Sequence, residues 1–311
     1  MTEFRATSLL FSLLVVGTAG VASAQDVAVG SADDPTMGGG DPSHVTPAPG
    51  DAAATAGGYS TSLARRSMTL PEHTLALGDG GPWAIGPVVR IFRTVTCSAD
   101  LMTGVLTCGG DTGLALNLGA SFGITDALQV DANVLPIWLS PEADYGSPRL
   151  GATYRFMSGR VIEVGARAGF TLLNVGNSRK VGLDVGIPLD AHFGRRGRLS
   201  TGAFLNVSLV DPDAVIGFAS PAILDYNLSA NIAIGMLSAI EIGTFKDVGE
   251  SFTIPIGLYG MYTVADAQDR AMLDVGASFM FPRFLTPASD GDAVHTDIWE
   301  IGLLARMHLY M

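Results

Sequence analysis

The chain has 311 residues, of which 48% are hydrophobic and only 15% charged, and its 30 acidic and 18 basic side chains give a formal net charge of −12. Only two of the basic residues are lysines, Lys180 and Lys246, so there is no basic stripe to neutralise phosphates and nucleic-acid binding is excluded. A mean hydropathy of +0.35 and 39 glycines exclude a largely disordered chain and indicate a membrane protein.

The first 24 residues predict a cleaved secretory signal peptide. Arg5 precedes an apolar run from Leu9 to Val16, and the triplet Ala22-Ser23-Ala24 before Gln25 fits the A-x-A cleavage pattern. An uncleaved membrane anchor is the alternative, which the small residues late in the segment disfavour. We therefore expect an exported protein.

Residues 25–68 predict a disordered tail rather than a domain. The stretch is rich in Gly, Pro, Ala and Asp and lacks apolar periodicity, so it cannot bury enough surface to become ordered. We expect a flexible periplasmic tail of unassigned role.

The two cysteines, Cys97 and Cys108, predict a disulfide bond. They lie eleven positions apart in a loop-like segment of an exported chain, where an oxidising compartment favours disulfides. A metal site is disfavoured because the residues between them include one acid, Asp100, and no histidine.

Residues 69–311 show a period of two that predicts strands. No stretch after the signal has 18 uncharged apolar residues, which excludes transmembrane helices on length. From Val161 to Thr171, for example, apolar side chains alternate with Glu163, Gly165 and Arg167. Twelve strands are predicted, at about 84–95, 112–122, 127–138, 147–157, 160–171, 180–193, 198–209, 223–235, 238–247, 251–263, 270–282 and 294–311.

The predicted connections alternate between tight and longer ones. Tight turns are expected at 123–126, 158–159, 194–197, 236–237 and 265–268, and longer loops at 96–111, 139–146, 172–179, 210–222 and 283–293. Only the connection at 248–250 is shorter than the alternation requires. Short periplasmic turns and longer outside loops are typical of an outer-membrane barrel, with both chain ends on the periplasmic side. A further strand at 70–79 leaves the count between ten and fourteen.

A soluble β-sandwich is the alternative fold, because alternation alone does not say which face is buried. Strands of 10–12 residues are about twice the usual soluble length and match a tilted membrane crossing. Their polar faces also carry small residues instead of the many Lys and Glu of a solvated face. The prediction is an all-β, antiparallel up-and-down transmembrane barrel.

The barrel region resembles Gram-negative outer-membrane β-barrels of the porin-like kind. The segment Leu114–Val130 is similar to a strand-turn-strand unit of such proteins, and the alternating last strand resembles their assembly signal. The chain departs from the pattern by ending in Tyr310-Met311 where a terminal Phe is usual. The resemblance implies recognition by a barrel-insertion machinery and assigns no subfamily. Acidic outside loops, with Glu142, Asp144, Asp211 and Asp213, predict contact with outer-leaflet lipopolysaccharide through divalent cations.

The faces assigned to the lumen carry more acids than bases. The acids are Asp131, Glu163, Asp184, Asp190, Asp225, Glu241, Asp274 and Glu300, and the bases are Arg149, Arg155, Arg167 and Arg306. If water fills the lumen, this excess attracts small cations. If the charges pair across a narrow interior, they form a polar core that closes the barrel.

The third class is an enzyme at the barrel rim. In the last outside loop, Asp290, Asp292, His295 and Asp297 form the one suggestive cluster, as a general base or as a weak Ca²⁺ site of the three carboxylates. A solvated acidic loop is the favoured interpretation because no nucleophile accompanies the cluster. The sequence thus predicts no enzyme and no cofactor, and favours passive, weakly cation-preferring diffusion of small solutes, with a closed structural barrel as the alternative.

Overall fold

The computed structural model describes residues 55–56, 59–78, 86–99, 106–173, 180–209, 214–246, 248–266, 270–287 and 294–311. The predicted signal peptide and residues 25–54 of the predicted tail lie outside this range. The elements are β1 (Thr55–Ala56), β2 (Tyr59–Ser60), η1 (Leu63–Arg65), β3 (Thr74–Gly78), β4 (Pro87–Ala99), β5 (Leu106–Thr125), β6 (Leu128–Ser140), β7 (Asp144–Tyr145), β8 (Arg149–Ser158), β9 (Ile162–Leu173), β10 (Lys180–Phe193), β11 (Gly197–Leu209), β12 (Ala214–Asn227), β13 (Ile232–Ile242), α2 (Val248–Ser251), β14 (Phe252–Ala265), β15 (Ala271–Leu285) and β16 (Trp299–Tyr310).

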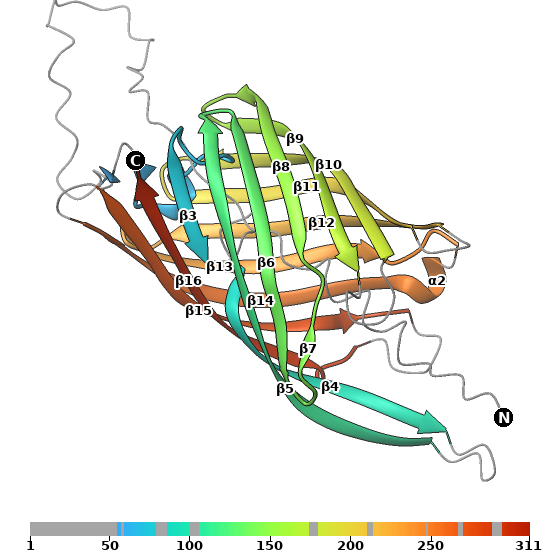
Figure 1. Cartoon of the computed structure of the whole chain (residues 1–311). Helices are drawn as coiled ribbons and strands as arrows, with labels where there is room; N and C mark the ends of the chain where they lie inside the picture. The colour runs from blue at the N-terminus through green and yellow to red at the C-terminus, as the bar shows by residue number, and fades with distance from the viewer. Residues whose placement is uncertain are drawn as a thin grey trace, which may run out of the picture.

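The strands close into one antiparallel barrel (Figure 1). Each strand from β8 to β16 pairs with its sequence neighbour, β6 pairs with β5 and β8, and β16 pairs with β4 to complete the ring. Closure leaves twelve strand positions, with β3 and the two-residue β7 as additional short strands. The predicted fold class and strand number are confirmed. In the described part of the chain, no helix is long and apolar enough to cross a membrane.

The two faces of the barrel wall differ sharply in chemistry. On β10, the outward side chains of Leu183, Val185 and Ile187 are 42–56% exposed, whereas the inward Asp184 and Asp190 are 6% and 0% exposed. The same division holds along β16, where Leu303 faces outward and Glu300, Arg306 and His308 face inward. An apolar outside around a charged inside is the arrangement that a lipid environment requires.

Exposed aromatic side chains gather near one end of the barrel. They lie close to the tight turns and are 46–55% exposed: Tyr154, Phe156, Phe193, Tyr226 and Tyr262. Aromatic residues at this level match the interfacial girdle of a membrane barrel.

The first strand position of the barrel is shared by two pieces of chain. β3 lies between β5 and β16 at Gly119–Phe122 and Met307–Tyr310, and β4 lies between the same two strands further along. The predicted strand at 70–79 therefore forms over Thr74–Gly78, but it does not add a thirteenth strand to the ring. Residues 79–85, between the two pieces, lie outside the described range.

Strands β12 and β13 differ from their predicted positions by several residues. Their turn is at residues 228–231, whereas the sequence predicted a turn at 236–237, which lies inside β13. The apolar alternation of Leu224, Tyr226, Leu228, Ile232 and Ile234 runs through the real turn, because a four-residue turn preserves the parity of a period of two. With β13 ending at Ile242, the next connection covers 243–251, so the alternation of tight and longer connections is restored.

The hairpin of β4 and β5 extends beyond the barrel rim (Figure 1). β16 pairs with β4 only as far as Arg93, and β6 pairs with β5 only from Leu114 onward. Beyond these residues β4 and β5 pair with each other alone, and Cys97 lies directly opposite Cys108 in their register. The side chains of both cysteines lie outside the described range, so the disulfide stays a prediction.

Candidate functional site: the barrel interior

Residues Ser60–Leu70, here called the inner segment, lie buried at the tight-turn end of the barrel. Leu63, Arg66 and Leu70 are at most 1% exposed. In Figure 1 this part of the chain, in blue, is at the end where β16 and the chain finish. The prediction of a disordered tail up to residue 68 is wrong for residues 60–68. Composition predicts disorder because the segment has too little apolar surface of its own to bury. In the barrel, polar side chains of the wall form hydrogen bonds with the segment and order it.

An ion pair anchors the inner segment to β15. Arg66 donates two hydrogen bonds of 2.6 Å to the two carboxylate oxygens of Asp274, and both side chains are buried. Asp274 also accepts a hydrogen bond of 2.7 Å from Thr263, and His308 Nε2 lies 2.9 Å from its Oδ2. This bidentate geometry is the strongest form of an arginine–carboxylate pair.

Backbone groups of the inner segment are satisfied by wall side chains on three further strands. The N–H of Ala64 donates to Asn227 Oδ1 on β12, that of Met68 to Glu163 Oε2 on β9, and that of Leu70 to Gln129 Oε1 on β6, at 2.6–2.9 Å. A buried peptide without such partners would be costly. The wall is therefore complementary to the segment around most of its circumference.

Arg198 on β11 supports the same end of the barrel. Its guanidinium donates to Asp225 Oδ2 at 2.8 Å and to the carbonyl oxygen of Arg66 at 3.2 Å. It is fully buried, so one arginine of the wall links a wall carboxylate to the inner segment.

A ladder of alternating charges crosses the middle of the interior. Arg167 on β9 holds Asp131 on β6 with two hydrogen bonds of 2.7 and 3.0 Å, and its Nε lies 3.4 Å from Asp184 on β10. Arg149 on β8 donates to the same Asp184 at 2.9 Å. Gly151 makes room for the ladder, because a Cβ there would lie 2.2 Å from Arg167 Nη2.

A smaller group lies further toward the outside loops. Arg90 on β4 pairs with Glu300 on β16 at 3.4 Å, and its guanidinium lies 5.6 Å from the ring centre of Trp138. The ring of Phe92 meets that of Trp138 edge to face at 4.8 Å.

The predicted lumen residues face the interior, and most of them lie in contacts with one another. Besides the pairs above, Arg155 donates to Glu163 at 3.1 Å, Arg306 donates to Ser121 at 3.1 Å, and Glu241 lies opposite Thr253 in register. Of the two interpretations left open by the sequence, the paired interior describes this structure better than free carboxylates around water.

Sequence reasoning missed three interior arginines. Arg66 was assigned to the tail, and Arg90 and Arg198 were not placed on a face. The position of Arg198 could have been predicted, because it lies two residues before the inward Ser200 on the same strand and therefore on the same face. With these three, the four predicted bases become seven against eight acids: Arg66, Arg90, Arg149, Arg155, Arg167, Arg198 and Arg306.

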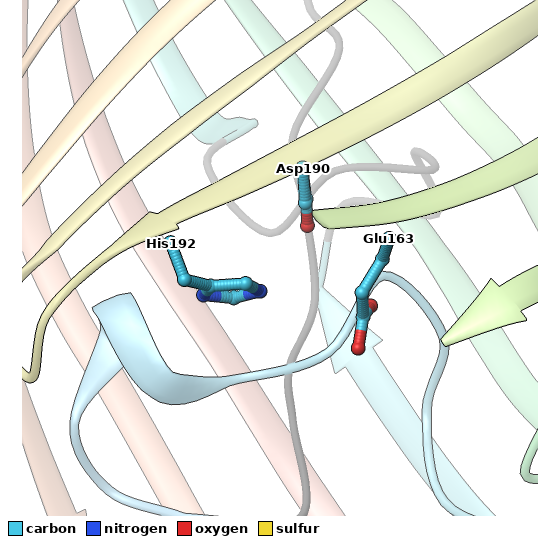
Figure 2. Close-up of side chains that lie close together, drawn as sticks. All are labelled: Glu163, Asp190 and His192. Atoms are coloured by element: carbon cyan, nitrogen blue, oxygen red, sulfur yellow. The ribbon is translucent and has the colours of Figure 1, made fainter. Parts of the chain in front are cut away.

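Glu163, Asp190 and His192 form a second cluster beside the inner segment (Figure 2). One ligand-type atom from each of them lies within 4.8 Å of the others, and all three residues are buried. Figure 2 shows the His192 ring and the Glu163 carboxylate turned toward the space below Asp190. Two carboxylates and an imidazole are a donor set suited to a divalent metal ion.

The predicted rim cluster is described only in part. Asp290 and Asp292 lie outside the described residues, and Asp297 is exposed. His295 Nε2 lies 2.9 Å from Thr286 Oγ1. The rim enzyme and the Ca²⁺ site gain no support from these contacts.

A closed antiparallel barrel with an apolar exterior and a charged interior defines a class of protein. The chain folds as a β-barrel of the transmembrane type, with twelve strand positions in its closed ring.

No protein-family model and no curated protein matches the chain. Similar solved structures include the KdgM porin in complex with disordered oligogalacturonate and the NanC porin, each with 8% identity and a TM-score of 0.42 over 72% of this chain and 99% of the other. The anion-selective porin from Comamonas acidovorans has 9% identity and a TM-score of 0.31 over 76% of this chain and 98% of the other. At such identities the similarity concerns the fold alone.

Proposed function

We propose that this chain is an outer-membrane pore for small solutes and that its inner segment closes the tight-turn end. The observation that supports the proposal is the room inside the barrel. The interior at that end holds the chain from Ser60 to Leu70 in addition to the side chains of the wall.

Strand number explains why this room exists. Barrels of about 8 strands are filled by their own side chains, and those of 16–18 strands leave an aqueous channel. A barrel of twelve strand positions lies between them, and a peptide fills what the side chains leave. If the inner segment leaves, water can take its place.

The chemistry of the contacts favours a removable closure over a hydrophobic core. The segment is held by hydrogen bonds to Glu163, Asn227 and Gln129 and by the ion pair to Asp274. Each of these wall groups can be hydrated when the segment is displaced, unlike an apolar surface, which resists exposure to water.

Topology supports an orientation for the closure. Short turns of outer-membrane barrels face the periplasm, so the inner segment would close the periplasmic mouth and residues 25–54 would extend from it. On the other side, acidic loop residues such as Glu142 and Asp144 would meet lipopolysaccharide through divalent cations. The last strand would be read by the barrel-insertion machinery of a Gram-negative bacterium.

A permanently closed structural barrel is the second candidate. It is favoured by the burial of the Arg66–Asp274 pair, since a buried ion pair of good geometry resists separation. The two candidates differ in whether displacement of the segment opens a conducting path.

Planar-bilayer conductance tests the proposal. The mature chain, refolded in detergent and checked by heat-dependent gel mobility, is compared with the Arg66→Ala variant and with a chain that starts at Pro71. We expect small or rare conductance steps from the mature chain and frequent, larger steps from both variants. If the folded variants never conduct, the pore is refuted and the closed barrel stands.

A further inference from the structure

We propose that Glu163, Asp190 and His192 bind one divalent transition-metal ion of the Zn²⁺ type, which fastens the inner segment to the barrel wall. The binding site is independent of any transport, whereas its role as a latch rests on the pore function proposed above.

The pairing of three strands creates the cluster. Glu163 on β9 lies opposite Asp190 on β10, and Asp190 lies opposite Ser200 on β11, so the three form one row across the wall. His192 follows two residues after Asp190 and therefore shares its inward face. The ligand atoms now lie within 4.8 Å of one another. Around one metal ion with bonds of about 2.1 Å they would be closer together, so they must approach one another by up to about 1.5 Å. Rotation of the carboxylates can supply this movement.

Unpartnered buried atoms point to a missing ligand. Asp190 is 0% exposed, and among the described residues neither of its carboxylate oxygens accepts a hydrogen bond of good geometry. Within the same described part of the chain, His192 Nε2 is also buried without a partner, and the Ser200 side chain lies beside Asp190. Burying a carboxylate without a donor costs free energy that a cation would offset.

The outer contacts of the cluster match those of metal ligands. His192 Nδ1 lies 3.1 Å from the carbonyl oxygen of Ala64, which can only accept, so Nδ1 carries the proton and Nε2 keeps its lone pair. Histidine ligands characteristically donate their second N–H to a carbonyl or carboxylate in this way. Glu163 is oriented by Ser67 Oγ at 3.0 Å and by the N–H of Met68 at 2.7 Å.

Two arginines near the cluster are engaged with other carboxylate oxygens. Arg155 donates to Glu163 Oε1, leaving Oε2 to the Met68 N–H and to a metal ion. Arg198 donates to Asp225 Oδ2. Asp190 accepts a hydrogen bond from neither arginine, although the charge of Arg198 is near enough to act on it.

Metal binding and docking of the segment are therefore coupled. Two of the three ligands are oriented by residues Ala64, Ser67 and Met68 of the inner segment. By linkage, a docked segment raises metal affinity, and a bound metal ion stabilises the docked segment by the same factor.

Direct zinc binding tests the site. Chelator-treated, refolded mature chain is equilibrated with Zn²⁺, and bound metal is measured after dialysis. We expect about one zinc ion per chain, lost in Asp190→Asn and His192→Gln and retained in Glu241→Gln, which removes a different interior carboxylate. Absence of binding to the folded chain, or binding that survives Asp190→Asn together with His192→Gln, overturns the site.

The segment variant Ser67→Ala tests the coupling. It removes an outer contact and no ligand, so zinc affinity should fall about tenfold while the stoichiometry stays the same. Unchanged affinity would refute the coupling.

Conductance measurements test whether the bound metal ion holds the inner segment in place. Their outcomes distinguish failure of this role from failure of the pore function. We expect a chelator to increase opening of the mature chain, but not of the chain that starts at Pro71. If that truncated chain conducts and the chelator leaves the mature chain unchanged, the latch is refuted. If neither chain conducts, the pore function fails, whereas the zinc titration still decides the site.

Discussion

Arg66, in the inner segment, forms an ion pair with Asp274 of the barrel wall. Its guanidinium matches both oxygens of Asp274, and its backbone carbonyl accepts from Arg198. A lysine could not make the bidentate contact, because it has no planar fork of donors. The position of the inner segment therefore depends on the identity of this residue and not on charge alone.

We expect Arg66→Ala to release the inner segment. Removing one partner of a buried ion pair typically costs about 3–5 kcal/mol. In this variant the loss would weaken docking of the inner segment, because Asp274 is left without its main partner. Trypsin should then cleave after Arg65 in the folded barrel, detected by mass spectrometry, whereas the parent chain stays protected. Glu72→Ala, in the exposed turn after the segment, should keep protection. Equal protection in Arg66→Ala would contradict the anchoring role.

Gly123 is required by close approach of the segment to β5. A Cβ at this position would lie 2.0 Å from the carbonyl oxygen of Pro71 and 2.9 Å from that of Leu70. Both are backbone atoms, which cannot turn aside as a side chain can.

Gly123→Ala should therefore displace the end of the inner segment from the wall at a cost of about 1–3 kcal/mol. Thermal unfolding followed by gel mobility and trypsin protection would both report it. Gly260→Ala is the matched control, since a Cβ at that strand glycine meets nothing within 4 Å. If the two variants behave alike, the close contact has no role in docking.

At the level of elements, the β4–β5 hairpin combines barrel wall and projection. Beyond Arg93 and Leu114 no third strand of the described residues pairs with it. An isolated two-stranded ribbon is marginally stable in water, so a covalent link there has a structural purpose.

We expect Cys97 and Cys108 to form that link. Without reductant, neither thiol should react with an alkylating agent in the folded protein, and reduction should expose both. Because the pair lies outside the ring of closed strands, reduction should leave heat-dependent gel mobility unchanged. Rapid alkylation without reductant would disprove the bond, and Cys97→Ser supplies the reference for one free thiol.

Element boundaries were predictable where turn chemistry interrupts the period of two. Gly194 ends β10 with a positive φ of 59°, and this turn was placed correctly. The turn after Asn227 contains Leu228 and Ala230, which continue the alternation, so the sequence pattern carried no sign of it. Its stability comes from Ser229, whose hydroxyl accepts from the N–H groups of Asn231 and Ile232.

At the scale of the whole molecule, the ion selectivity of the proposed pore would depend on whether the inner segment is docked. The wall carries eight of the named acids against six arginines, and the inner segment brings two more arginines, the half-buried Arg65 and the buried Arg66. The charge of the interior is therefore close to neutral with the segment docked, and it would be weakly acidic without the segment.

We expect a small cation preference from the Arg66→Ala barrel, measured as the reversal potential under a salt gradient. Most of its wall carboxylates are paired with arginines, which limits their effect on passing ions. The additional change Glu241→Gln should reduce the preference, because Glu241 lies opposite Thr253 instead of a base. An anion-favouring reversal potential would contradict this charge balance.

The sequence by itself predicted the fold class, because a period of two over long strands with small polar faces favours a closed sheet in lipid over a soluble sandwich. Parity along a strand is a local property, and it assigned twelve charged residues to one face, but Arg66, Arg90 and Arg198 were not among them. Tertiary structure alone decided that Ser60–Leu70 belongs to the interior and that Glu163, Asp190 and His192 meet beside it. These contacts join residues up to 208 positions apart, as in Arg66 and Asp274, and depend on strand register and closure, which no local pattern contains.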